Sequence, residues 1–485
     1  MHVNLNELNL LHSRIGSPGV FMNVSAQTVS DDLLRRFDVP GPRYTSFPTA
    51  DRFVEAFTAV DYAQALSQRR SGVAARSLPL SIYVHIPFCE SLCYYCACNK
   101  VITRHHERAA PYLRYLEREV ELHTQQMGKG QAISQLHLGG GSPTFLTDEE
   151  LGQLMAMLRR NFHFAAAAEY SIEIDPRTVD VGRLDALARL GFNRLSFGVQ
   201  DFDLAVQKAV HRLQPAAQVF AMVEAARNRG FESVNVDLIY GLPRQSPESF
   251  DRTLVQITSL RPDRVALYAY AHLPERFKPQ RRIDAAELPS GAAKVAMLSR
   301  SLTALRAAGY VYVGMDHFAL PEDALAVAKR QGRLHRNFQG YSTQPDCDLI
   351  GLGVSSIGRV GATYSQNAKT MDEYCDLLDQ GQLPVVRGLA LTRDDLVRRA
   401  VIMALMCQGQ VQFESINLSY LIDFRTYFTN ELQSMQSLVE QGLAVVDEAG
   451  IQVTAQGWFF VRAVAMVFDR YLQADRTRAR FSKII

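Results

Sequence analysis

Residues 81–100 read SIYVHIPFCESLCYYCACNK, and this stretch decides how the rest of the chain is interpreted. Its first half is an apolar run of the kind that forms a buried strand. Four cysteines follow at once as C-x3-C-x2-C-x-C, at positions Cys89, Cys93, Cys96 and Cys98. Three thiolates on one short loop can hold one face of an iron–sulfur cubane, because these clusters prefer soft, anionic ligands. The loop therefore predicts a [4Fe–4S] cluster whose fourth iron has no protein ligand.

An iron without a protein ligand is typical of a catalytic site rather than a closed structural one. A sulfonium cofactor could chelate that iron, accept an electron and break a carbon–sulfur bond. A zinc knuckle is the alternative, but zinc sites usually pair distant C-x2-C units, and the sequence has no second pair. The other cysteines, Cys347, Cys375 and Cys407, are scattered and are expected to be ordinary thiols.

Outward from the cysteine loop, short apolar runs alternate with helical patterns between about residues 80 and 320. The runs begin at Ser81, Ile133, Tyr170, Asn193, Val234, Arg264 and Tyr310. Helix-start signals separate some of them: Thr147 with Glu150 forms a capping box, and Ser246 precedes Pro247. About six or seven such units predict an α/β protein with a closed or partial parallel barrel, because right-handed crossovers wrap a parallel sheet.

Polar side chains near the ends of these runs indicate where the site lies. Glu173 and Asp175 share one face of their run, and Asp237 alternates with apolar residues in another. Strands buried on both faces normally read as continuous apolar runs. Ionisable groups near the carboxyl ends of parallel strands therefore favour a catalytic mouth, with a structural salt-bridge network as the alternative.

The chain divides into three parts on its residue pattern. Residues 1–50 are expected to be an N-terminal extension with a possible lid, GPRYTS from Gly41, and residues 51–385 to form the barrel. Residues 386–485 are expected to form a helical module with a small β-wing, LAVVDEAGIQVT from Leu443. The module shows no basic recognition helix, and RTRAR from Arg476 is interpreted as a solvated end.

Composition excludes several classes of protein. The 485 residues are 47% hydrophobic and 21% charged with a net charge of +2, as in ordinary globular proteins, so no nucleic-acid partner is expected. No run approaches the ~20 apolar residues that a membrane-spanning helix needs. The segment from Met1 to Met22 lacks the features of a secretory signal, and Met22 is an alternative start. A cytoplasmic monomer is therefore expected, in which clustered thiols indicate a metal site.

The cysteine loop resembles that of the radical S-adenosylmethionine (SAM) superfamily, in which C-x3-C-x2-C follows the first strand. Further motifs are YVHIPFC from Tyr83, Cys98, GPRYTSFPTA from Gly41, HLGGGSPTFL from His137, NVDLIYGLP from Asn235, GMDHFA from Gly314 and HRNFQGYSTQ from His335. Together they are similar to the oxygen-independent coproporphyrinogen III oxidase family, from about residue 30 to the C-terminus. The resemblance implies a partial parallel (β/α) barrel of the radical SAM type with a mainly helical, wing-containing C-terminal domain.

The resemblance also implies site residues and two SAM molecules. The cluster would be held by Cys89, Cys93 and Cys96. The first SAM would contact Tyr83, Gly140, Glu173 and Ile357. The second would contact Tyr95, Gly141, Ser142, Gln200, Arg212, Asp237 and Ala271. The side-chain types at Tyr95 and Ser142 vary within the family. Cys98 would lie beside the second SAM as a catalytic hydrogen-transfer group, or be a plain packing thiol.

The chemistry of these residue types agrees with such roles. The glycines 139–141 follow a strand and precede a capped helix, which predicts close backbone approach to a ligand with amides pointing at it, or else a plain tight turn. Glu173 and Asp237 suit ribose hydroxyls or an ammonium group, and Arg212 suits a carboxylate.

The implied activity is oxidative decarboxylation of two propionates of coproporphyrinogen III to vinyl groups, giving protoporphyrinogen IX in anaerobic porphyrin or haem biosynthesis. A 5′-deoxyadenosyl radical would remove a hydrogen from the β-carbon of each propionate. The expected partners are a porphyrinogen substrate, a donor such as flavodoxin or ferredoxin, and an unidentified electron acceptor. Candidate cations for the four substrate carboxylates are Arg43, Lys100, Arg104 and Arg336. The main alternative is a haem-binding chaperone of the same superfamily, which usually lacks a cysteine at position 98 and the GPRYTS segment.

Overall fold

The computed structural model describes residues 31–37, 39–72, 78–344 and 346–474. The predictions about Met1, Met22 and the RTRAR stretch from Arg476 lie outside the described residues. Within this part of the chain the main sheet has 12 strands, in the order β16-β15-β14-β13-β1-β4-β5-β6-β7-β8-β10-β9. The strands β13 to β8 in this order pair in parallel. Their bounds are β1 Leu80–Ile86, β4 Gln131–Gly140, β5 Phe162–Ile174, β6 Arg194–Gln200, β7 Ser233–Tyr240, β8 Arg264–Ala269 and β13 Leu349–Leu352.

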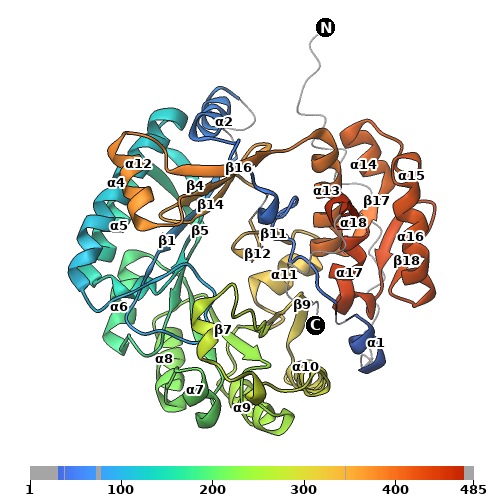
Figure 1. Ribbon diagram of the computed structural model, residues 1–485, viewed down its shortest axis with the longest axis horizontal. Coiled ribbons are helices and arrows are strands. Elements are labelled where there is room, and N and C mark those ends of the chain that lie inside the picture. The colour runs from blue at the N-terminus through green and yellow to red at the C-terminus, as the bar shows by residue number, and fades with distance from the viewer. Residues whose placement is uncertain (1–30, 38, 73–77, 345, 475–485) are drawn as a thin grey trace.

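Helices cover the outer face of this parallel sheet (Figure 1). They are α4 Ala109–Met127, α5 Asp148–Asn161, α6 Val181–Leu190, α7 Leu204–Ala209, α8 Ala216–Asn228, α9 Pro247–Leu260 and α10 Gly291–Ala307. The predicted starts of two helices are confirmed: Thr147 caps α5 with Glu150, and Ser246 caps α9 just before Pro247. Because each crossover returns the chain to the same edge, the carboxyl ends of the strands meet at one mouth.

The run from Tyr310 was predicted to be the last parallel strand of the series, and this prediction is wrong. The run from Tyr310 forms two short strands, β9 Val311–Gly314 and β10 His317–Ala319, that pair antiparallel with each other, and β10 pairs antiparallel with β8. Gly314 and Met315 have φ values of 150° and 53°, so the chain reverses between the two strands. The antiparallel strands β14 Ile357–Val360, β15 Thr363–Asn367 and β16 Val385–Ala390 extend the other edge. The ends of this sheet, β16 and β9, do not pair, so the barrel is partial.

Four further elements flank the barrel. They are α2 Ala59–Ser71, α11 Ala324–Arg330, α12 Met371–Asp379 and the antiparallel hairpin of β11 His335–Asn337 with β12 Gly340–Ser342. Among the described residues, no helix combines the length and apolarity needed to cross a membrane.

The C-terminal part is helical with a wing, as expected. Helix α13 Arg393–Gln408 starts at the capping box of Thr392 and Asp395. It is followed by α14 Phe413–Tyr420, α15 Phe424–Tyr427, α16 Thr429–Glu440, α17 Val461–Met466 and α18 Arg470–Ala474. The predicted strands of the wing are β18 Ala444–Val446 and β19 Gly450–Val453, and β17 Gln410–Gln412 pairs with β19.

The GPRYTS segment, which follows helix α1 Asp31–Arg36, is clamped by the C-terminal helices. Arg462 donates hydrogen bonds to the carbonyls of Pro42, at 3.0 Å, and Gly41. Tyr44 donates to Asp469 at 3.0 Å and is 1% exposed. These contacts make the segment a buried link between the barrel and the C-terminal helices.

Candidate active site

The cysteine loop begins where β1 ends and is tied back on itself. Short strands β2 Phe88–Cys89 and β3 Val101–Ile102 pair in parallel, and the Thr103 amide donates to the Cys89 carbonyl at 2.9 Å. The loop between them carries the remaining cysteines at the carboxyl ends of the parallel strands. Its three predicted ligands line a cavity of about 450 Å³ inside the barrel mouth: Cys89, Cys93 and Cys96.

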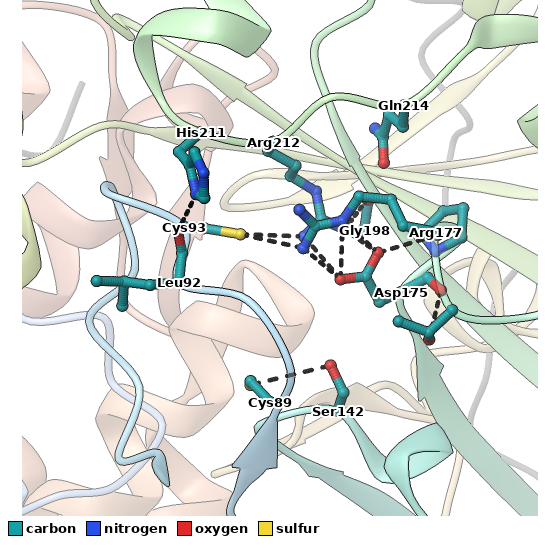
Figure 2. Close-up of polar contacts among 12 residues, drawn as sticks. Cys89, Leu92, Cys93, Ser142, Asp175, Arg177, Gly198, His211, Arg212 and Gln214 are labelled. Atoms are coloured by element: carbon teal, nitrogen blue, oxygen red, sulfur yellow. Dashed lines mark hydrogen bonds and ion pairs between the residues drawn. The ribbon is translucent and has the colours of Figure 1, made fainter. Parts of the chain in front are cut away.

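Two guanidinium groups face the sulfur of Cys93 (Figure 2). Arg177 and Arg212 each place a terminal nitrogen 3.4 Å from Cys93 Sγ. Both arginines also bind Asp175, which lies at the end of β5. Positive charge beside this sulfur stabilises a ligating thiolate, and Asp175 limits the cost of burying that charge.

The other cysteines have different surroundings. Ser142 Oγ donates to Cys89 Sγ at 3.9 Å, and burial raises the pKa of Cys89 to about 12. A hydrogen bond with Cys98 is the main cause that lowers the pKa of Cys96 to about 6. Cys98 lines both this cavity and a neighbouring one of about 300 Å³, which places it between the two.

The glycine triplet packs against the cysteine strand. A Cβ at Gly140, where φ is 113°, would lie 2.5 Å from the His85 ring, and one at Gly141 would lie 2.6 Å from the Phe88 carbonyl oxygen. The Gly141 and Ser142 amides donate to Ile86 and Phe88, and the Gly140 amide donates to Glu173. The prediction that these amides point at a ligand is therefore wrong, because the close approach is to the chain's own backbone.

The residues expected around the first SAM come together. Tyr83, Gly140, Glu173 and Ile357 all line the 300 Å³ cavity. Burial raises the pKa of Glu173, but hydrogen bonds from His137, at 3.3 Å, and from the Gly140 amide outweigh it, so its pKa falls below the usual value. Glu173 is therefore an ionised acceptor at neutral pH.

The residues expected around the second SAM line the 450 Å³ cavity, with one exception. Those brought together are Tyr95, Gly141, Ser142, Gln200, Arg212 and Asp237. Ala271 lies outside this lining; its carbonyl accepts a 3.2 Å hydrogen bond from Gln280, which also donates to the Tyr95 carbonyl at 3.1 Å. Burial, followed by the charge of Glu173, raises the pKa of Asp237 to about 7.

Several lining residues were missed by sequence reasoning. They are His85, Asn99, Arg177, Tyr268, Phe338, Gln339, Ser355 and Ser356. Arg177 stands two residues after Asp175 in the sequence Asp-Pro-Arg, and Tyr268 ends an apolar run, so both carried a weak signal. Of the candidate substrate cations, Lys100 lines the cavity and Arg104 is exposed on the surface.

The donor set fits a polynuclear cluster with a polar cofactor beside it. Three thiols line one cavity, and Gln200 Oε1 is buried there without a hydrogen-bond partner in the described chain.

Known protein families and proteins match most of this chain. The radical SAM superfamily model matches residues 83–257, and the HemN C-terminal domain model matches residues 391–460. The oxygen-independent coproporphyrinogen III oxidase of Pseudomonas aeruginosa is 50% identical over 94% of this chain and 98% of its own length. That of Escherichia coli K12 is 46% identical over 95% of this chain and 100% of its own.

The fold is also that of a solved relative. The structure of coproporphyrinogen III oxidase (HemN) from Escherichia coli, described as a radical SAM enzyme, matches with a TM-score of 0.86 and 47% identity, over 92% of this chain and all of the other. The expected fold class and family are confirmed. The chain therefore belongs to the oxygen-independent coproporphyrinogen III oxidases, radical SAM enzymes of haem biosynthesis.

Proposed function

We propose that the chain decarboxylates two propionates of coproporphyrinogen III to vinyl groups at a [4Fe–4S] cluster held by Cys89, Cys93 and Cys96. The observation that carries the proposal is one cavity lined by all three thiols and by the polar ends of β5, β6 and β7. When bound, the cluster and SAM supply a radical that removes hydrogen from unactivated carbon. The protein's own residues bind, orient and exclude water.

Two SAM molecules are proposed because two cavities adjoin. They share Cys98, Gly140 and Glu173, so a ligand in each would meet at these residues. Glu173 offers an ionised acceptor to one of them, and Gln200 and Asp237 offer polar groups to the other. A catalytic role for Cys98 rests on its place in both linings.

We also propose a division of the chain into three parts and a pair of electron carriers for the enzyme. Residues 51–385 form the catalytic barrel, residues 386–485 the C-terminal module, and residues 1–50 an extension with a possible lid. A flavodoxin or ferredoxin supplies electrons to a monomeric enzyme, and a separate acceptor removes them.

The test is anaerobic incubation of reconstituted protein with coproporphyrinogen III, SAM and a low-potential reductant. Protoporphyrinogen IX and 5′-deoxyadenosine should form together, with two equivalents of the nucleoside for each product. Haem binding without turnover would instead indicate a haem-binding chaperone. SAM cleavage at a rate that coproporphyrinogen III leaves unchanged would indicate a different substrate.

A further inference from the structure

Arg336, on β11, is a buried cation without an acidic partner. It is 5% exposed, and in the described part of the chain no carboxylate forms an ion pair with it. Its Nε donates to the Arg43 carbonyl at 3.2 Å, while its Nη1 is buried with no hydrogen-bond partner. A buried guanidinium normally has a partner for its charge, because removing an ion from water is strongly unfavourable.

Its neighbours add positive rather than negative charge. Arg43 already pairs with Asp316, and Arg462 donates to the carbonyls of Pro42 and Gly41. Burial, together with the charges of Arg43 and Arg336, lowers the pKa of Arg462 to about 9. The positive charges of Arg43, Arg336 and Arg462 therefore repel one another, which favours the binding of an anion beside Arg336.

A second unpartnered polar atom lies next to this cation. His317, on β10, has a buried Nδ1 with no hydrogen-bond partner. Its ring centroid lies 5.6 Å from that of Tyr341, and the guanidinium of Arg336 lies 4.6 Å from the same tyrosine ring. The contact with the Tyr341 ring leaves Nη1 of Arg336 without a hydrogen-bond partner.

These groups adjoin the catalytic cavity. Tyr268 lines that cavity, and its ring lies 6.0 Å from the His317 ring and 5.1 Å from the Arg43 guanidinium. On the other side, Phe338 and Gln339 follow Arg336 in sequence and line the neighbouring cavity. Arg336 and His317 thus lie one layer behind residues that line the two cavities, and a carboxylate of a bound ligand would have to extend past Tyr268 to reach them.

We propose that Arg336, with His317 beside it, binds a carboxylate of the porphyrinogen and so anchors the macrocycle by a side chain that is not reacting. A carboxylate fits because it would accept from Arg336 Nη1 and from His317 with its proton on Nδ1. This inference rests on the proposed function for its choice of ligand.

The test is a binding measurement on the reconstituted holoenzyme without turnover. Coproporphyrin III, the oxidised tetracarboxylate, is titrated anaerobically with wild type, Arg336→Met and Arg336→Lys, using quenching of porphyrin fluorescence. Removal of the charge should weaken binding at least about tenfold, and lysine should restore part of it. Mesoporphyrin IX, which has only two carboxylates, should lose less affinity. Arg118→Met, at an exposed arginine of helix α4 that is paired with Asp379, is the control and should bind normally.

Stability separates an anchoring role from a structural one. Because Arg336→Met removes an unpaired buried charge and keeps apolar bulk, its melting temperature should equal or exceed that of wild type. His317→Gln, which has a similar shape, should weaken coproporphyrin III binding in the same direction. Wild-type affinity in Arg336→Met, or weaker binding together with a lower melting temperature, would overturn the inference. If wild type binds coproporphyrin III through Arg336 yet never converts coproporphyrinogen III, only the proposed function fails.

Discussion

Arg212 binds Asp175 through both of its terminal nitrogens, each 3.2 Å from a carboxylate oxygen. The arginine is 6% exposed and the aspartate 9%, so the pair is buried. The Arg212 guanidinium, which was expected to bind the carboxylate of a ligand, is thus already bound to the Asp175 carboxylate. That pair positions Arg212 beside Cys93 and leaves its Nε without a hydrogen-bond partner in the described chain.

Removing one member of this pair should destabilise the barrel. Among the described residues, Arg212→Met leaves Asp175 with Arg177 as its remaining ion-pair partner, so the loss should be smaller than the about 3–5 kcal/mol typical of a buried charge left unpaired. Arg212→Met with Asp175→Asn should recover part of the loss. Urea unfolding of the metal-free proteins measures the change in the free energy of unfolding. Arg118→Met, at an exposed arginine, is the control and should change it by less than about 1 kcal/mol. Equal stability of the single and double variants would contradict the pairing.

The cluster ligands should differ sharply from the other thiols. Cys93→Ser should lose most of its iron and the visible absorption of an iron–sulfur protein, because oxygen replaces a soft thiolate. Cys98→Ser and Cys375→Ser should keep both. Iron and sulfide analysis after anaerobic reconstitution is the measurement. Retention of the full cluster in Cys93→Ser, or its loss in Cys98→Ser, would require a different ligand set.

Gly141→Ala should disturb the cluster loop. The new methyl group would lie 2.6 Å from the Phe88 carbonyl, and backbone there cannot move without shifting Cys89. We expect a lower melting temperature and substoichiometric iron. Gly291→Ala is the control, because nothing lies within 4 Å of that position and it starts helix α10. A Gly141→Ala protein that melts and binds iron like wild type would exclude the tight contact.

Asp237 should make stability fall as pH rises. Its pKa is raised to about 7, mainly by burial, whereas the unfolded carboxyl titrates near 3.8. The folded state therefore holds one more proton between these values, and the free energy of unfolding falls as pH rises through this window. Asp237→Asn should remove that decline, because the amide does not titrate. At about 1.4 kcal/mol per pKa unit, its free energy of unfolding should exceed that of wild type by at most about 4 kcal/mol above pH 7, and by little near pH 4. Unfolding of the metal-free protein at pH 5 and pH 8 measures this difference. Exposed Asp372→Asn is the control, and parallel pH profiles for wild type and Asp237→Asn would contradict the shift.

Local patterns carried most of what could be predicted. The cysteines of the loop are close together in sequence, so the cluster site could be predicted directly. Glu173 and Asp237 lie near the ends of strands, where the two-residue alternation shows which face of the sheet a side chain is on. Because the strands were predicted to be parallel, both residues were expected at the same barrel mouth. Strand β13 escaped notice because four residues, Leu349–Leu352, give no periodic signal.

Contacts between distant segments could not be read from the sequence. The pairing of Arg212 with Asp175 depends on how far β6 and its following helix carry the chain. The amides of Gly141 and Ser142 donate to Ile86 and Phe88 only because β4 and β1 are neighbours. Ala271, outside the cavity lining, is held by Gln280, which lies in the short 3-10 helix Lys278–Arg282.

The clamp on the GPRYTS segment has a consequence for biogenesis. Tyr44 is synthesised before the barrel, whereas its partner Asp469 lies 425 residues later, after the barrel. During synthesis all residues of the barrel are therefore present before the contact between Tyr44 and Asp469 can form. A cluster inserted before that contact forms would enter a barrel whose GPRYTS segment is not yet bound by the C-terminal helices.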